Sequence, residues 1–142
     1  PWHVAKNRAD KTGVVIADLL ARTEVDSYVL IGHSLGARAM SVAAQTLGTK
    51  TDGPRLEAVH LLGAAIADDI DGNALTAQVD DAVYNYHSAN DKVLKYLYTL
   101  AQGGQTAAGL SGFASSHAKL KNTNTSDHVE RHSDYHTTVT LL

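Results

Sequence analysis

The stretch that decides the fold is Tyr28-Val29-Leu30-Ile31-Gly32-His33-Ser34-Leu35-Gly36. An apolar run leads into a turn centred on a serine, and a helical stretch follows from Ala37 to about Leu47. In that context the G-x-S-x-G pattern predicts a sharp strand-to-helix turn that exposes the serine hydroxyl. We expect a strained backbone at Ser34, and we expect side chains at Gly32 or Gly36 to collide with the neighbouring strand and helix.

Two roles are open to Ser34. A serine at a strand–helix turn commonly caps the helix through its side chain. The buried strand before the turn and the helix after it favour the other role, that of an exposed nucleophile. The amide of Leu35, at the start of the helix, would then point toward an oxyanion formed beside the hydroxyl. The sequence therefore predicts Ser34 as the nucleophile and Leu35 as an oxyanion-hole residue.

The composition is that of one globular domain, which we expect to span residues 1–142. The net charge of -3 comes from 15 acidic and 12 basic residues without a long run of either sign, which argues against nucleic-acid binding. The chain has no cysteine, so disulfides and thiolate metal sites are excluded. No apolar stretch approaches the ~20 residues of a membrane span. No cofactor is expected, and the sequence assigns no cellular compartment.

The apolar pattern predicts helices and strands in alternation. Helices are expected over residues 2–22, 37–47, 73–80 and 92–101, and strands over residues 27–32, 56–62, 82–87 and 119–125. This order indicates an α/β fold with a mostly parallel sheet and helices on both faces. The strand at 27–32 lacks polar alternation, which is typical of a central buried strand. The polar strand at 119–125 is expected at the sheet edge.

Two segments carry weaker signals. Residues 102–116 hold four glycines and many small residues, and we expect a mobile or loosely packed loop there. Residues 127–142 begin with a histidine-rich turn and are expected to end in an apolar helix or strand.

A serine nucleophile needs a base, and an imidazole held by a carboxylate is the usual one. In hydrolases with this turn, the acid and then the histidine follow the serine in the chain. Asp91 fits the acid best, because it lies four residues past the strand at 82–87 and just before a helix. It is also a good helix N-cap, although the neighbouring Asn90 could take that role. Asp68 and Asp69, which follow the strand at 56–62, are the next candidates.

The histidine is left open among His128, His132 and His136, whereas His117 precedes the last strand and is at its wrong end. The three are spaced by four, so a helix would align them on one face. With the nearby acidic residues this spacing would suit a metal ion. That interpretation leaves Ser34 and Asp91 unexplained, so we predict no metal site.

Several motifs together resemble a known family. They are Leu30-Ile31-Gly32-His33-Ser34-Leu35-Gly36-Ala37-Arg38, Leu61-Leu62-Gly63-Ala64, Asn90-Asp91-Lys92-Val93-Leu94-Lys95-Tyr96-Leu97-Tyr98 and Val129-Glu130-Arg131-His132-Ser133-Asp134-Tyr135. The chain resembles the carboxyl-terminal half of an α/β-hydrolase. More narrowly, it is similar to a hydrolase family whose larger members carry transmembrane and coiled-coil segments. In that family the histidine before x-Asp-Tyr takes the place of the base, so the resemblance implies His132.

The resemblance implies a serine esterase or lipase-like enzyme that acts on a small-molecule or lipid-like ester through Ser34, His132 and Asp91. A complete α/β-hydrolase has earlier strands, and a loop after one of them supplies the second oxyanion amide. We expect this chain to lack those strands, so another chain or segment would pair at the sheet edge. The alternative function is a catalytically weak or inactive scaffold of the same fold that binds other proteins.

Overall fold

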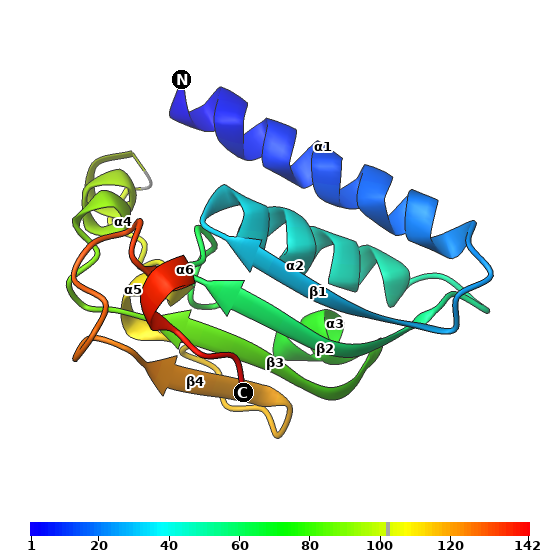
Figure 1. The fold of residues 1–142 in the computed structure, drawn as a ribbon. Helices are drawn as coiled ribbons and strands as arrows, with labels where there is room; N and C mark the ends of the chain where they lie inside the picture. The colour runs from blue at the N-terminus through cyan, green and yellow to red at the C-terminus, as the bar shows by residue number, and fades with distance from the viewer. Residues whose placement is uncertain (102) are drawn as a thin grey trace.

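The computed structural model describes residues 1–101 and 103–142 and shows an α/β fold (Figure 1). The elements in chain order are α1 (Trp2–Ala21), β1 (Ser27–His33), α2 (Leu35–Leu47), β2 (Arg55–Leu62), α3 (Gly72–Thr76), β3 (Val79–His87), α4 (Lys92–Tyr96), the π-helical turn η1 (Leu97–Ala101), α5 (Ala108–Ser111), β4 (Leu120–Asn124) and α6 (Tyr135–Thr138). The predicted fold class is confirmed.

The four strands form one sheet in the order β1-β2-β3-β4, and every neighbouring pair is parallel. Parallel strands end at the same edge of a sheet, so the loops that follow them meet there. β4 lies at one edge of the sheet, as its polar sequence predicts. The other edge strand is β1, which pairs only with β2 among the described residues.

The prediction that the strand at 27–32 is central and fully buried is wrong. Val29 is 46% exposed and Ile31 is 53% exposed, whereas Leu30 between them is buried. Side chains alternate along a strand, and here only the face carrying Leu30 packs against α2. An apolar run without polar alternation therefore does not distinguish a central strand from an edge strand.

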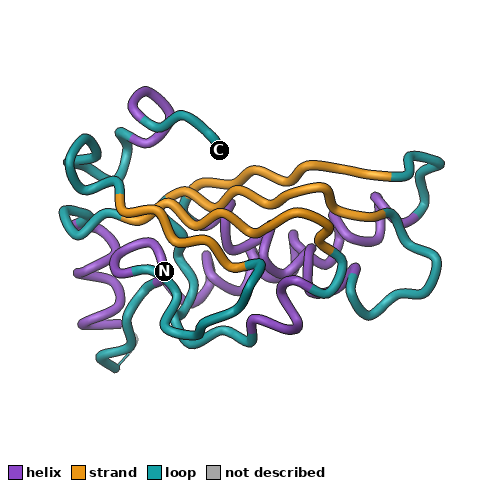
Figure 2. Tube along the Cα trace, turned by 90° about the horizontal axis from the view of Figure 1, so that it is seen from below, coloured by secondary structure: helices purple, strands orange, loops and turns teal. Residues whose placement is uncertain are grey.

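Most of the helices lie on one face of the sheet, whereas α6 and the C-terminal residues lie on the other (Figure 2). The sequence predicts the connecting helices on both faces. In the sheet, each strand lies next to the one before it in the chain, always on the same side. Connections between parallel strands have the same handedness, so all of them cross the same face of this sheet. The main core fills the space between the sheet and α2, with Leu30, Val59, Leu61 and Val83 among its members.

Helix α1 packs along α2, and Gly13 lies where the two approach most closely. A Cβ at Gly13 would collide with the carbonyl oxygen of Ala39 and with Val42. Glycine lowers helix propensity, so Gly13 weakens the helical signal of the sequence. Helix α1 nevertheless continues through it. The residue is glycine because the contact with α2 leaves no room for a side chain.

Three segments differ from their predicted structure. Residues 73–80 do not form one helix, since α3 ends at Thr76 and β3 begins at Val79. The apolar end of the chain forms only the single turn α6.

Residues 107–113 are not a loose loop, because Ala107, Ala108 and Phe113 are buried. A Cβ at Gly109 would strike the backbone of Gly63 and Ala64, so small residues serve close packing here. Gln102 lies outside the described residues.

Across residues 1–101 and 103–142, no helix is both long enough and apolar enough to cross a membrane. This agrees with the absence of a predicted span in the sequence.

Candidate active site

Three side chains meet in a hydrogen-bonded series where the strands end. Ser34 directly follows β1, Asp91 follows β3, and His132 follows β4. The Oγ of Ser34 lies 2.7 Å from Nε2 of His132. On the other side of the ring, Nδ1 of His132 lies 2.6 Å from Oδ2 of Asp91. The structure therefore brings together the three side chains that the sequence analysis singled out.

The backbone of Ser34 adopts a conformation that side chains rarely tolerate. Its φ is 58° and its ψ is −121°, in the region that favours glycine. Backbone hydrogen bonds hold it there, because its N–H donates to Leu62 and its carbonyl accepts from Ala65 and Arg38. The hydroxyl makes no capping hydrogen bond to α2. Its contact is His132, so the capping role is not the one that Ser34 has.

The two glycines of the motif have different reasons to be glycine. A Cβ at Gly32 would lie 2.5 Å from the carbonyl oxygen of Gly36 and 2.6 Å from the nitrogen of Ala37. These distances are shorter than real contacts, so the steric prediction holds for Gly32. It is wrong for Gly36, where a Cβ would have nothing within 4 Å. Gly36 lies in the first turn of α2 and is exposed.

A matched pair of variants tests this difference. Gly32→Ala should destabilise the protein by about 2 kcal/mol or more, because backbone atoms must move to make room. Gly36→Ala should leave the free energy of unfolding unchanged or raise it by up to about 1 kcal/mol, because alanine favours a helix. Urea denaturation of both variants measures the two values. Equal effects would contradict the assigned geometry.

Asp91 uses both of its carboxylate oxygens. Oδ1 accepts a hydrogen bond of 3.0 Å from the backbone N–H of Leu94 and so caps α4. Oδ2 faces His132, and the side chain is completely buried. The sequence left the cap open to either Asp91 or Asn90, and in the structure Asp91 combines both roles. Asn90 instead donates from Nδ2 to the carbonyls of Ser126 and Val129, which joins its loop to the one carrying His132.

For a neutral His132 ring, the two hydrogen bonds indicate the tautomer. An ionised carboxylate only accepts hydrogen bonds, so Nδ1 of His132 carries a proton and donates to Asp91. Nε2 is then free to accept the proton of the Ser34 hydroxyl. The His132 side chain is 16% exposed, so the ring is reachable from solvent on one side while Asp91 is sealed.

His33 also belongs to the site, and the sequence analysis gave it no role. Its Nε2–H donates to the backbone carbonyl of His132 over 2.7 Å. Its ring lies 4.8 Å from the His132 ring and 5.7 Å from the Tyr135 ring. Burial lowers the pKa of His33, which favours the neutral ring. Burial also raises the pKa of Tyr135. His33 thus holds in place the segment that carries His132.

The remaining candidates lie elsewhere. His117 packs beside Thr76, with its Nδ1 accepting from the backbone of Lys119. His128 and His136 are exposed, and residues 128–134 do not form the helix that would align them with His132. Neither Asp68 nor Asp69 takes the position beside His132 that Asp91 holds. In the described part of the chain, no group of three or more metal-binding side chains could hold an ion.

A cleft of about 880 Å³ opens beside His132. Residues from the turn before α4, from α4 and from the loop before α6 line it: Ala89, Asn90, Lys92, Val93, Lys95, Glu130, Arg131, His132 and Ser133. His132 lines this cleft, whereas Ser34 and Asp91 are not among the lining residues.

The comparison with protein families decides the relationship of the chain. The model of a family described as "Protein of unknown function (DUF726)" matches residues 1–142. The chain belongs to the DUF726 family. No solved structure shows a significant match to it.

Curated relatives of this DUF726 chain include a probable lipase and proteins named for membrane segments. An uncharacterized membrane protein of Schizosaccharomyces pombe is 31% identical over 137 residues, which cover 94% of this chain and 24% of the relative. A transmembrane and coiled-coil domain-containing protein of Oryza sativa subsp. japonica is 31% identical over 140 residues, 94% of this chain and 21% of that protein. A probable lipase of Saccharomyces cerevisiae is 28% identical over 139 residues, 95% of this chain and 13% of that protein. The chain thus spans a quarter or less of these relatives.

Proposed function

We propose that this chain is the catalytic part of a serine ester hydrolase of the α/β-hydrolase type. The observation that carries the proposal is the continuous series from Ser34 Oγ through the His132 ring to the buried Asp91 carboxylate. Two further findings support it: the strained turn at Ser34 and a relative named as a probable lipase. A serine that served only as a helix cap would need neither the hydrogen-bonded series nor the strained backbone.

The proposed reaction has two steps. Ser34 Oγ attacks the ester carbonyl carbon while its proton passes to Nε2 of His132. The tetrahedral intermediate collapses, the bond to the alcohol oxygen breaks, and His132 gives that oxygen its proton. A water molecule then attacks the acyl group on Ser34 with His132 again as base, which releases the carboxylic acid and restores the serine. Asp91 orients the ring and stabilises its positive charge in both steps.

Leu35 would supply a donor to the oxyanion. It is the first residue of α2, so its N–H has no acceptor within the helix. The position next to the nucleophile, at the positive end of a helix, is where such a donor stabilises developing charge.

The surroundings of the cleft favour an ester with an apolar acyl chain. Val93 lines the cleft and is 46% exposed, and Tyr96 and Leu100 on the same helical segment are 66% and 67% exposed. Large apolar side chains exposed together beside a binding cleft are typical of a surface that contacts apolar ligands. Lys92 and Lys95 flank them, which suits an ester whose head group is polar or negatively charged.

A series of p-nitrophenyl esters tests the proposed activity and its acyl preference. We expect kcat/KM for the octanoate to exceed that for the acetate by about tenfold or more, since each buried methylene contributes up to about 0.8 kcal/mol. Val93→Ser should reduce this preference, whereas Val14→Ser on α1 should not. A protein that hydrolyses none of these esters would contradict the function, and a flat profile would contradict only the acyl preference.

Asp91→Asn separates the catalytic role of Asp91 from its structural one. Asparagine keeps a carbonyl oxygen for the N–H of Leu94, so α4 should remain capped. Its NH₂ group would face His132 and favour the wrong tautomer, so kcat should fall by about 10³- to 10⁴-fold. Steady-state kinetics and thermal unfolding measure the two effects. A fall in stability that accounts for the whole loss of rate would argue against the catalytic role.

The scaffold alternative rests on the exposed side chains of β1. Val29 and Ile31 form an apolar surface at a sheet edge, where another chain could pair. Such binding would not require an imidazole between a serine and a buried carboxylate. The two functions make opposite predictions for Ser34→Ala, which should not affect a binding scaffold.

A further inference from the structure

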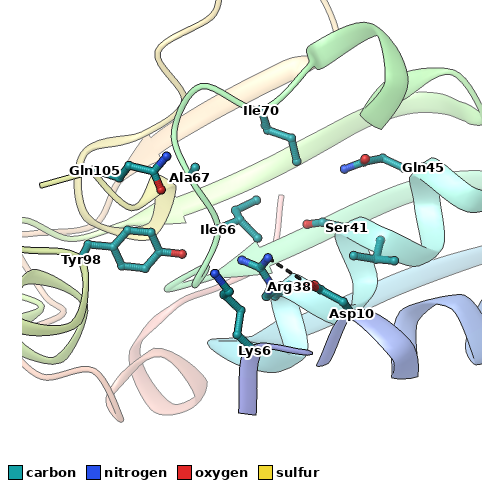
Figure 3. Close-up of a pocket in the computed structure, with 11 residues that line it drawn as sticks. Lys6, Asp10, Arg38, Ser41, Gln45, Ile66, Ala67, Ile70, Tyr98 and Gln105 are labelled. Carbon is teal, nitrogen blue, oxygen red and sulfur yellow. Dashed lines mark hydrogen bonds and ion pairs between the residues drawn. The ribbon is translucent and has the colours of Figure 1, made fainter. Parts of the chain in front are cut away.

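A second cavity lies on the helix-covered side of the sheet, apart from the cleft at His132. It has a volume of about 340 Å³ and is lined by residues of α1, α2, the loop after β2, η1 and the loop before α5 (Figure 3). Neither Ser34 nor His132 lines it. The volume is at the lower end of the range for small-molecule sites and corresponds to roughly ten water molecules.

The Tyr98 hydroxyl points into this cavity, toward the guanidinium of Arg38. The side chain is 2% exposed, and its hydroxyl makes no hydrogen bond within the described residues. Burial raises the pKa of Tyr98 to about 12, against the influence of Arg38, so the hydroxyl stays neutral and able to donate. Buried polar groups are nearly always satisfied, and an orphan at a cavity wall indicates a missing ligand or water. Tyr98 belongs to the π-helical turn η1, a feature that is frequent at functional sites.

Positive charge gathers around the hydroxyl. Figure 3 shows the Lys6 ammonium and the Tyr98 hydroxyl pointing toward the guanidinium of Arg38. Arg38 donates to both oxygens of Asp10 and to the carbonyl of Ala65, which uses three of its five N–H groups. The ionisable side chains that line the cavity are those of Lys6, Arg38 and Asp10. The Asp10 contacts also fix the guanidinium in one orientation.

The opposite wall is of a different character. Ile66 and Ile70 present apolar surface, and the amide groups of Gln45 and Gln105 lie at the margins. A ligand that matches both walls has an anionic group and a short apolar body. Inorganic phosphate matches only the cationic wall.

We propose that this cavity binds a small organic anion, with its carboxylate or phosphate held by Arg38, Lys6 and the Tyr98 hydroxyl. The apolar part of the ligand would lie against Ile66 and Ile70. This inference is independent of the proposed esterase activity, because it uses none of the residues of that reaction. Carboxylates and phosphate esters share the chemistry that the three donors recognise, and the experiment distinguishes them.

The test is a titration of the ¹⁵N-labelled protein followed by NMR. The probes are butyrate and butyl phosphate, with neutral butyramide as the control. At least one anion should bind saturably and shift the amides of residues next to the cavity, such as Arg38, Ile66 and Ile70. Tyr98→Phe should weaken that binding by about tenfold or more, because a hydrogen bond to a charged group is lost. Tyr28→Phe, in β1 and outside both the cavity and the cleft, should leave it unchanged.

Tyr98→Phe is expected to fold, because the hydroxyl that it removes makes no hydrogen bond with the residues that the structure describes. Its thermal midpoint should equal or exceed that of the parent protein. The inference is overturned if neither anion binds at millimolar concentration, in which case the cavity holds only water. It is also overturned if butyramide binds as well as the anions, or if Tyr98→Phe binds them unchanged. Shifts confined to the basic cleft at Lys92, Lys95 and Arg131 would likewise contradict it.

Discussion

Replacing Ser34 by alanine should lower the rate of ester hydrolysis by roughly 10⁴-fold or more, which removes almost all activity. The change deletes only the oxygen that lies 2.7 Å from Nε2 of His132. No capping hydrogen bond is lost with it, because the hydroxyl makes none to α2. The free energy of unfolding should therefore stay close to that of the parent protein.

The matched control is Ser116→Ala, which removes an exposed serine from a loop outside the cleft. Its kcat should equal that of the parent within error. If Ser34→Ala retained most of the activity while remaining folded, the hydrolysis would have to use another nucleophile, and the proposed mechanism would fail.

His132→Ala should have an effect of similar size, about 10⁴-fold or more on kcat, because the hydroxyl then has no base. Its controls are His128→Ala and His136→Ala, which remove exposed imidazoles with the same spacing in the chain. Both controls should retain nearly full activity in the same ester assay.

The three histidine variants also test the choice of His132 as the base, which rests on the family resemblance. A loss in His128→Ala or His136→Ala as large as that in His132→Ala would contradict the choice of base. Equal partial losses in all three variants, together with sensitivity to chelators, would instead favour the metal alternative.

The sequence predicted the fold class because its strongest signals are local. The apolar runs of β1, β2 and β3 and the long pattern of α1 locate the main elements to within a few residues. The exposure of Val29 and Ile31 could not be predicted, because it depends on which strands and helices lie next to β1. The tight packing of residues 107–113 was also missed, since a run of small residues reads equally well as a loop or as a close contact.

The candidate site was partly predictable. Ser34 and Asp91 follow from their places after strands, since parallel strands end at one edge. Spacing alone left three histidines, and the resemblance selected His132. His33 could have been found from the two-residue period of β1, which places it on the face that carries the His132 loop. The Tyr98 cavity depends on the packing of five separate segments, and no motif indicates it.

The measurement that tests the central claim most directly is mass spectrometry of the protein after reaction with a fluorophosphonate probe. Such probes modify a serine that a neighbouring imidazole activates, because the phosphonyl group mimics the acyl transition state. We predict one adduct, located on Ser34, that forms rapidly in the parent protein and in His136→Ala but very slowly in His132→Ala. A folded protein that gains no adduct, or gains it on a different residue, would contradict the assignment of Ser34 as the nucleophile.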